Sequence, residues 1–208
     1  MTLLVPASAE DVTMARFAEF AGRSGVPTLV TSAFDRVTVS VRAERDRTHD
    51  VRILVDGAEV RGVLNRGPGP MDGFGPSREF AAAEAVSAWW STLALWPGPV
   101  INRPARHGFF PEFESREPSG SARARRYLVA GAELFDLDAK RRAAPTEVAG
   151  LRPVVDRLNE YAARFLLLTV EPDGERLRLV EASCWPVEHE FAGLEEAVYA
   201  GLLEWFER

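Results

Sequence analysis

The chain has 208 residues, of which 46% are apolar and 27% are charged, and its net charge is −6. Such a chain can bury one good core, or one core and a small lobe. The negative charge argues against a general nucleic-acid binder. No run approaches the roughly 20 apolar residues that cross a bilayer, and the first residues do not resemble a signal peptide. We therefore expect no nucleic-acid partner, no membrane association and a cytoplasmic location.

Cysteine and lysine occur once each, as Cys184 and Lys140. One cysteine excludes an internal disulfide and a cysteine-based zinc site. Reactions that use a lysine as nucleophile or phosphate clamp have only Lys140 to draw on. Cys184 and His189 could form a nucleophilic pair, but no orienting group is identifiable, which favours a buried structural cysteine.

The first half of the chain alternates strand and helix signals. Residues 3–8 and 27–32 have the composition of strands, and residues 12–21 between them have apolar side chains at helical spacing. This βαβ pattern predicts that the two strands are parallel neighbours. Asp56-Gly57 lies between alternating apolar runs, which predicts a hairpin of two antiparallel strands over residues 51–65.

Two predicted strands end in the same dipeptide, Asn65-Arg66 and Asn102-Arg103, with a predicted helix over residues 78–95 between them. The apolar face of this helix is expected at Phe80, Ala83, Val86, Trp90 and Leu93. Open α/β sheets bind ligands at the carboxyl ends of their strands, and arginine and asparagine suit a carboxylate or phosphate. A purely structural role explains the dipeptides about as well. In that case the asparagines and arginines would hydrogen-bond to the turn backbone and contact water.

Residues 105–125 show no periodicity and are rich in proline, glycine and charge. A segment of this length without regular structure is uncommon inside a compact protein. We take it as a linker or partner-binding loop. Arg106 could extend the strand-end site, and Phe109 and Phe110 could bind a partner.

The second half is predicted to be a mixed α+β unit. Residues 126–137 indicate a hairpin around Gly131-Ala132, and a helix is expected over residues 151–164. Two strands joined at Pro172-Asp173-Gly174 and a helix over residues 193–206 complete it. Strict alternation along the last strand would put Glu181 on the same face as Leu177 and Leu179. Either a metal position or a salt bridge would explain a carboxylate there.

The order of these signals resembles the ATP-grasp superfamily, in particular the ligases that tailor ribosomal peptides and join amino acids. The matching segments are VRGVLNRGP, REFAAAEAVSAWWSTL and VINRP in the first half, with RARRYLVAGAELFDL and FLLLTVEPDGERLRLVEASCWP in the second. The resemblance implies an α/β fold with three parts. These are a pre-ATP-grasp-like open sheet with flanking helices (1–104), the linker (105–125), and an antiparallel α+β remnant of the ATP-grasp domain (126–208).

The resemblance also implies a nucleotide site from which this sequence departs. Family members hold magnesium ions with an aspartate on one closing strand and a Glu-x-Asn on the next, and carry an arginine near the phosphates. Arg126 matches that arginine and Glu181 matches the glutamate, whereas Leu167 and Ser183 stand at the aspartate and asparagine positions. Only residues 105–125 stand in place of the central lobe with its nucleotide-gripping lysines.

Three functions remain open at this point. The first is a noncatalytic accessory subunit of a biosynthetic pathway, with no cofactor, that binds a protein partner (a full-length ligase or a second copy) or a peptide or amino-acid substrate. The second is an ATP-dependent carboxylate–amine ligase that completes an ATP and magnesium site with another chain. The third is a plain small-ligand domain without nucleotide ancestry.

Overall fold

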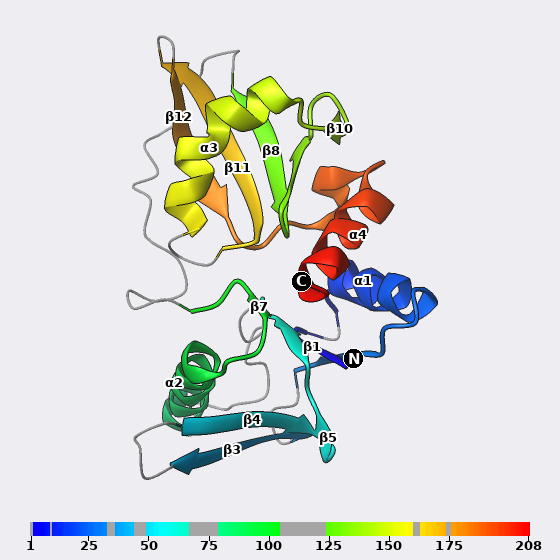
Figure 1. Cartoon of the computed structure of the whole chain (residues 1–208), viewed down its shortest axis with the longest axis vertical. Coiled ribbons are helices and arrows are strands. Elements are labelled where there is room, and N and C mark those ends of the chain that lie inside the picture. The colour runs from blue at the N-terminus through cyan, green and yellow to red at the C-terminus, as the bar shows by residue number, and fades with distance from the viewer. Residues whose placement is uncertain are drawn as a thin grey trace. The chain divides into compact units, whose positions relative to one another are not determined.

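The computed structural model describes residues 2–8, 10–32, 36–43, 49–66, 79–104, 124–159, 163–173 and 176–208. The chain divides into two compact units, residues 1–104 and 105–208 (Figure 1). Among the described residues, no helix combines the length and the hydropathy that a membrane-spanning segment needs. The observed architecture is α/β, as the sequence predicts.

The first unit is built on a parallel sheet with the strand order β2-β1-β6-β7. These strands are β1 (Leu3–Pro6), β2 (Thr28–Thr31), β6 (Gly62–Leu64) and β7 (Val100–Ile101). β1 pairs with β2 in parallel, so the predicted βαβ opening is confirmed. β6 and β7 are also parallel neighbours, with Leu64 opposite Ile101. Both Asn-Arg dipeptides therefore follow adjacent strands at the same edge of one sheet.

A second, antiparallel sheet in this unit has the order β3-β4-β5. Its strands are β3 (Val37–Ala43), β4 (His49–Val55) and β5 (Ala58–Glu59). The Asp56-Gly57 turn is confirmed, and both residues have positive φ, as such a hairpin turn requires. The predicted extent of its second strand is wrong, because β5 ends at Glu59. The chain then passes through Val60 into β6, which pairs in parallel with β1.

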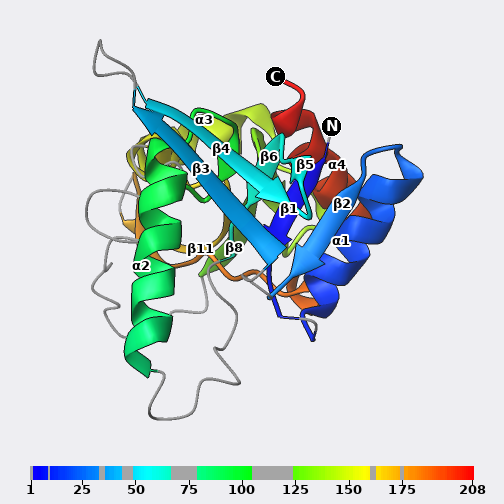
Figure 2. The same ribbon diagram turned by 90° about the horizontal axis from the view of Figure 1, so that it is seen from below.

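The described part of the first unit has two helices, α1 (Val12–Arg23) and α2 (Glu79–Leu95) (Figure 2). A core cluster joins α2 to both sheets through Trp89, Leu93 and Trp96. The apolar face predicted for α2 is right at Leu93, which is buried in this cluster, and wrong at Phe80, which is 78% exposed. Trp90 is partly buried against the same cluster. The sequence of α2 is apolar nearly all round, so its periodicity could not fix which side is buried.

The described residues of the second unit form an antiparallel sheet with the order β10-β9-β8-β11-β12. Its strands are β8 (Arg125–Ala130), β9 (Glu133–Asp136), β10 (Arg141–Arg142), β11 (Phe165–Asp173) and β12 (Arg176–Ser183). β8 and β9 form the predicted hairpin around Gly131-Ala132. One sheet face, with Tyr127 and Val129, packs in a cluster with Leu151 of α3 (Pro145–Asn159).

Helix α4 (Glu195–Phe206) follows the short 3-10 helix η3 (Glu188–Phe191) and packs against the β8–β9 hairpin. The contact is close: a Cβ on Gly131 would lie 2.3 Å from the carbonyl oxygen of Gly201 and 2.9 Å from Cβ of Trp205. Gly131 also has a φ of +64°. Glycine is therefore required at this turn for space and for backbone conformation.

A bulge between β11 and β12 determines where Glu181 points. Val170 lies opposite Leu179 and Thr169 lies opposite Glu181, so Val180 is an extra residue on β12. An extra residue reverses the face on which the following side chains lie. Glu181 is therefore on the opposite face from Leu177 and Leu179, and it is exposed. The face predicted for Glu181 from strict alternation is wrong for this reason.

Candidate functional site

The two Asn-Arg dipeptides lie side by side at the carboxyl ends of the neighbouring strands β6 and β7. Asn65 is fully buried, its main-chain N–H donates to the carbonyl of Ile101 (3.0 Å), and its side-chain amide donates to the carbonyl of Asn102 (3.1 Å). Asn102 has a φ of +56°, a left-handed conformation that asparagine tolerates better than most residues. The asparagines thus join the ends of β6 and β7.

Arg66 lies against the start of helix α1. Its Nε is 3.0 Å from Oδ2 of Asp11, and the Arg66 side chain is only 5% exposed. Asp11 is also the N-cap of α1, where its Oδ1 accepts a hydrogen bond from the N–H of Met14 (3.0 Å). Asp11 therefore connects the first helix to the end of β6, as a capping aspartate with a second charged neighbour can.

Arg103 lies at the C-terminal end of helix α2, in the same unit. Its guanidinium donates to the carbonyls of Leu93 (2.5 Å), Trp96 (2.7 Å) and Gly98 (2.5 Å). The last carbonyls of a helix have no partner within the helix, and an arginine fork can satisfy several at once. Burial lowers the pKa of Arg103 below its ordinary value. Arg103 thus acts as a C-terminal cap of α2 in this structure.

Three polar side chains form a row across the second sheet, on the face opposite the α3 cluster. Arg126 of β8 lies opposite Thr169 of β11, and Thr169 lies opposite Glu181 of β12. The Arg126 side chain is 49% exposed, with its Nε 3.3 Å from Oδ1 of Asp138. The sequence reasoning predicted Arg126 and Glu181 as site residues but did not place Thr169 between them. Arg106, Phe109 and Phe110, also predicted as site residues, lie outside the described residues.

The neighbouring positions of this row decide how well it suits magnesium. Leu167 lies opposite Ser183, one row away on the same face. Glu171, further along β11, is buried and is paired with Arg178 at 2.9 Å. One exposed carboxylate beside two hydroxyls is a poor donor set for two magnesium ions, which favour octahedral oxygen ligands. These residues therefore do not fit a two-magnesium site, and within the described part of the chain no three His, Cys, Asp or Glu side chains cluster as metal ligands.

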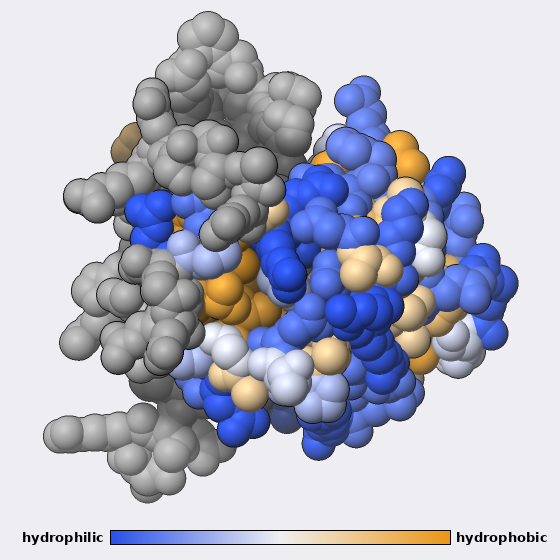
Figure 3. Space-filling model, turned by 90° about the horizontal axis from the view of Figure 1, so that it is seen from above, coloured by the Kyte–Doolittle hydropathy of each residue, from blue (hydrophilic) through white to orange (hydrophobic). Residues whose placement is uncertain are grey.

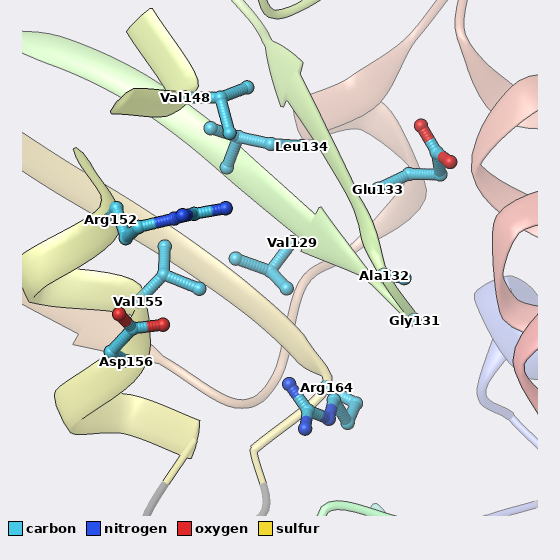
Figure 4. Close-up of a pocket in the computed structure, with 10 residues that line it drawn as sticks. All are labelled: Val129, Gly131, Ala132, Glu133, Leu134, Val148, Arg152, Val155, Asp156 and Arg164. Carbon is cyan, nitrogen blue, oxygen red and sulfur yellow. The ribbon is translucent and has the colours of Figure 1, made fainter. Parts of the chain in front are cut away.

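A pocket of about 230 Å³ lies on the α3 side of the same sheet. Figure 4 shows its side chains, and Arg152 extends from α3 to between Leu134 and Val129. The remaining lining residues come from the hairpin, α3 and the start of β11: Gly131, Ala132, Glu133, Val148, Val155, Asp156 and Arg164. Glu133 points away from the others in Figure 4, and its Oε2 lies 3.3 Å from Nη1 of Arg142. The pocket therefore combines an apolar wall with two arginines and one aspartate.

Sequence reasoning did not find this pocket, because it placed the start of α3 at residue 151. The helix begins at Pro145, where the fixed φ of proline and the absent N–H suit a first helical position. Glu147 supports that start by accepting a hydrogen bond from the N–H of Ala144 (2.7 Å). Ala144-Pro145 followed by Glu147 is a helix-start signal in the sequence. It predicts a helix that begins at Pro145 and so includes both Val148 and Arg152.

The surface around the second unit is mainly polar. Figure 3 shows a described surface that is mostly hydrophilic, with a small hydrophobic area left of its centre. This agrees with a chain in which 27% of residues are charged. On the face shown, hydrophobic residues are therefore confined to small areas.

Comparison with known proteins gives matches in structure and none in sequence. No protein-family model matches the chain, and no curated protein matches it.

Several solved structures match it over nearly its whole length. The ATP-grasp ligase PsnB, complexed with precursor peptide PsnA2 and AMPPNP, has a TM-score of 0.65 at 11% identity, over 100% of this chain and 98% of that chain. The macrocyclase MdnC from Microcystis aeruginosa MRC, bound with precursor peptide MdnA, has a TM-score of 0.60 at 8% identity, covering 98% and 99%. A RimK domain ATP-grasp protein from Sphaerobacter thermophilus has a TM-score of 0.56 at 12% identity, covering 100% of both chains.

The parallel sheet of the first unit and the antiparallel sheet of the second together define an α/β protein built from two sheet-based units. The fold of this chain is similar to the folds of these ATP-grasp proteins, which agrees with the resemblance in its sequence.

Proposed function

We propose that this chain is a noncatalytic ATP-grasp-like accessory protein of a peptide-modifying biosynthetic system, and that it binds a peptide through the α3 pocket. The observation that carries the first part is the residue pairing on the β8–β11–β12 face. Leu167 stands opposite Ser183, and Thr169 stands opposite Glu181. Phosphoryl transfer requires metal ions that neutralise the charge on the phosphates. This face offers only one exposed carboxylate to hold them.

The strand-end arginines support the same reading. Arg66 lies against Asp11 and Arg103 against three main-chain carbonyls. A guanidinium must leave these partners before it can hold a phosphate or carboxylate, and breaking buried charged contacts is costly. Asn65, Arg66, Asn102 and Arg103 therefore serve the proposed function by holding the fold of the first unit.

The peptide part of the proposal rests on the size and chemistry of the α3 pocket. Its volume of about 230 Å³ falls below the roughly 300–1,000 Å³ of sites that enclose small molecules. It suits one or two side chains of a peptide. The apolar wall fits an aliphatic or aromatic side chain, and Arg152 with Arg164 favours an adjacent acidic group. The fold matches include PsnB and MdnC complexed with precursor peptides, which agrees with a peptide ligand.

A random peptide library displayed on phage and selected against the full chain tests the pocket. Enriched peptides are expected to carry an apolar residue beside an acidic one. Val148→Asp removes part of the apolar wall and places a carboxylate one helical turn from Arg152, so it should weaken binding of a selected peptide at least tenfold.

Val187→Asp is the matched control, because Val187 is 36% exposed and Val148 is 38% exposed, and Val187 lies outside the pocket. Charge reversal gives a second pair, with Arg152→Glu expected to weaken binding and Arg208→Glu expected to leave it unchanged. Selected peptides that bind all four variants equally would overturn the proposed pocket.

A second function has one specific observation in its favour. Arg126, Thr169 and Glu181 lie side by side on three neighbouring strands, so a partner chain could complete a nucleotide site there. In that case a complementary chain from the native source should co-purify and restore ATP hydrolysis. Glu181→Ala should abolish the hydrolysis, whereas Glu196→Ala, at an exposed position on α4, should not. Hydrolysis that survives Glu181→Ala would exclude this alternative.

A further inference from the structure

Strand β3 is the longer of the two outer strands of the β3-β4-β5 sheet. It is seven residues long, and its pairing with β4 runs without a break from Val37 opposite Val55 to Ala43 opposite His49. Within the described residues, its outer edge has no strand partner. About 23 Å of strand backbone, at 3.3 Å per residue, is therefore available for pairing.

This edge lacks the features that normally prevent strands from pairing with other chains. Proteins protect such edges with proline, bulges or charged side chains that point inward. The sequence of β3 is VTVSVRA, and Arg42 is its only charged residue. Val39 is 37% exposed and Val41 is 59% exposed. The β4 residues opposite them, Ile53 and Val51, are buried on the core side of the sheet.

The sequence of β3 is also complementary to itself. In an antiparallel pair centred on Ser40, Val39 of one copy lies opposite Val41 of the other, and Thr38 lies opposite Arg42. One face of the pair would then be apolar and the other polar, with no like charges directly opposite. Aligned β-branched pairs stabilise antiparallel sheets, whereas opposed like charges destabilise them.

We infer that β3 is a homodimer interface, in which two copies of this chain pair their β3 strands antiparallel about Ser40 and extend the sheet across a twofold axis. The occupant of the edge is a second copy because the strand matches itself in register, face and charge. An isologous contact of this kind closes at two subunits, because each copy's β3 edge is then paired. The interface lies in the first unit, so it is independent of the peptide pocket in the second.

The dimer should be weak and depend on concentration. One strand pair buries less than the roughly 1,000 Å² expected of a stable interface. The weight-average mass should therefore rise from 23.0 kDa towards twice that value as the protein concentration is increased.

A cysteine scan along β3 tests the pairing and its register in the full chain. Ser40→Cys should form a disulfide-linked dimer under mild oxidation, because facing residues of antiparallel strands have Cα atoms about 4.5 or 5.5 Å apart, within disulfide range. Thr38→Cys should not, because it faces Arg42 of the second copy. The wild-type protein, whose single thiol at Cys184 is buried, measures the background level of cross-linking. Failure of Ser40→Cys to cross-link, or equal cross-linking of Thr38→Cys, would overturn the proposed register.

Sedimentation velocity on the unoxidised protein provides the second test. Val41→Lys should reduce the dimer to monomer at every concentration, because two lysines would lie close together on the apolar face. Val12→Lys is the control: Val12 is 60% exposed and lies on α1, so its variant should dimerise like the wild type. A wild-type protein that stays monomeric up to its solubility limit would refute the interface. The same holds if Val41→Lys dimerises normally.

Discussion

Arg103 of the first unit and Arg126 of the second differ in what their guanidinium groups contact. Arg103 is half-buried and donates to three main-chain carbonyls at the end of α2. Arg126 is 49% exposed and contacts one carboxylate, Asp138, which is itself 44% exposed. Removal of Arg103 leaves buried acceptors unsatisfied, whereas removal of Arg126 leaves groups that water can reach.

The difference shows that a repeated motif at strand ends can be explained by the fold alone. The two Asn-Arg dipeptides resemble a ligand site in sequence, but in the structure they join β6, β7, α1 and α2. In the second unit, the described residues form the α3 pocket, and the polar sheet row includes the exposed side chains of Arg126 and Glu181. Substitutions at the strand ends should therefore destabilise the protein more than substitutions on the polar sheet row.

Arg103→Met should destabilise the protein by about 2–4 kcal/mol, since three carbonyls lose their donor in a partly buried setting. Chemical denaturation gives the value directly. Arg103→Lys should recover only part of the loss, because an ammonium lacks the planar fork that reaches all three carbonyls. A loss below 0.5 kcal/mol would place Arg103 among the exposed, replaceable arginines.

Asn65→Ala should cost about 1–3 kcal/mol, because it removes the donor to the carbonyl of Asn102 at a fully buried position. The same denaturation experiment measures it. Ser40→Ala, a polar deletion at a position only partly buried, is the comparison and should cost less. Equal costs would mean that the link between β6 and β7 contributes little.

Glu147→Gln should cost about 1 kcal/mol at neutral pH, through the weakened start of α3 and the lost ion pair with Arg141. Hydrogen bonds from Arg141 and the N–H of Ala144 lower the pKa of Glu147 to about 2, from 4.5. A lowered pKa means that this stabilisation is fully present above pH 4.5 and is lost as the pH falls towards 2. The wild-type and variant unfolding free energies should therefore converge over that range, and a difference that stays constant would contradict the assignment.

Arg126→Met should change stability by less than about 0.5 kcal/mol, because exposed ion pairs contribute little. Thermal or chemical unfolding would show it. A loss comparable to that of Arg103→Met would mean that the polar row is structural in the same way as the strand ends.

Much of the fold follows from local signals in the sequence. The βαβ opening, the Asp56-Gly57 turn and the hairpin at Gly131-Ala132 are all read correctly because periodicity and turn chemistry act within a few residues. The sequence did not predict that residues 51–65 are divided between two sheets, with β4 and β5 in one and β6 in the other. That choice depends on which distant strand, β1 or β4, the segment pairs with, and long-range pairing leaves no local mark.

The site was harder to predict than the fold, for similar physical reasons. The face of Glu181 depends on the bulge at Val180, and one inserted residue changes every subsequent face. The partners of Arg66 and Arg103 lie at or just beyond the ends of helices whose orientation the sequence does not specify. The pocket requires the packing of α3 against the β8–β9 hairpin, so Arg152 and Arg164 carried no signal of their own.

Calorimetric titration of the isolated full chain with MgATP tests the central claim most directly. The donor set around Glu181 and the engaged arginines of the first unit predict no binding heat beyond dilution. Saturable binding in the micromolar range would contradict the noncatalytic reading and show that this chain grips a nucleotide by itself.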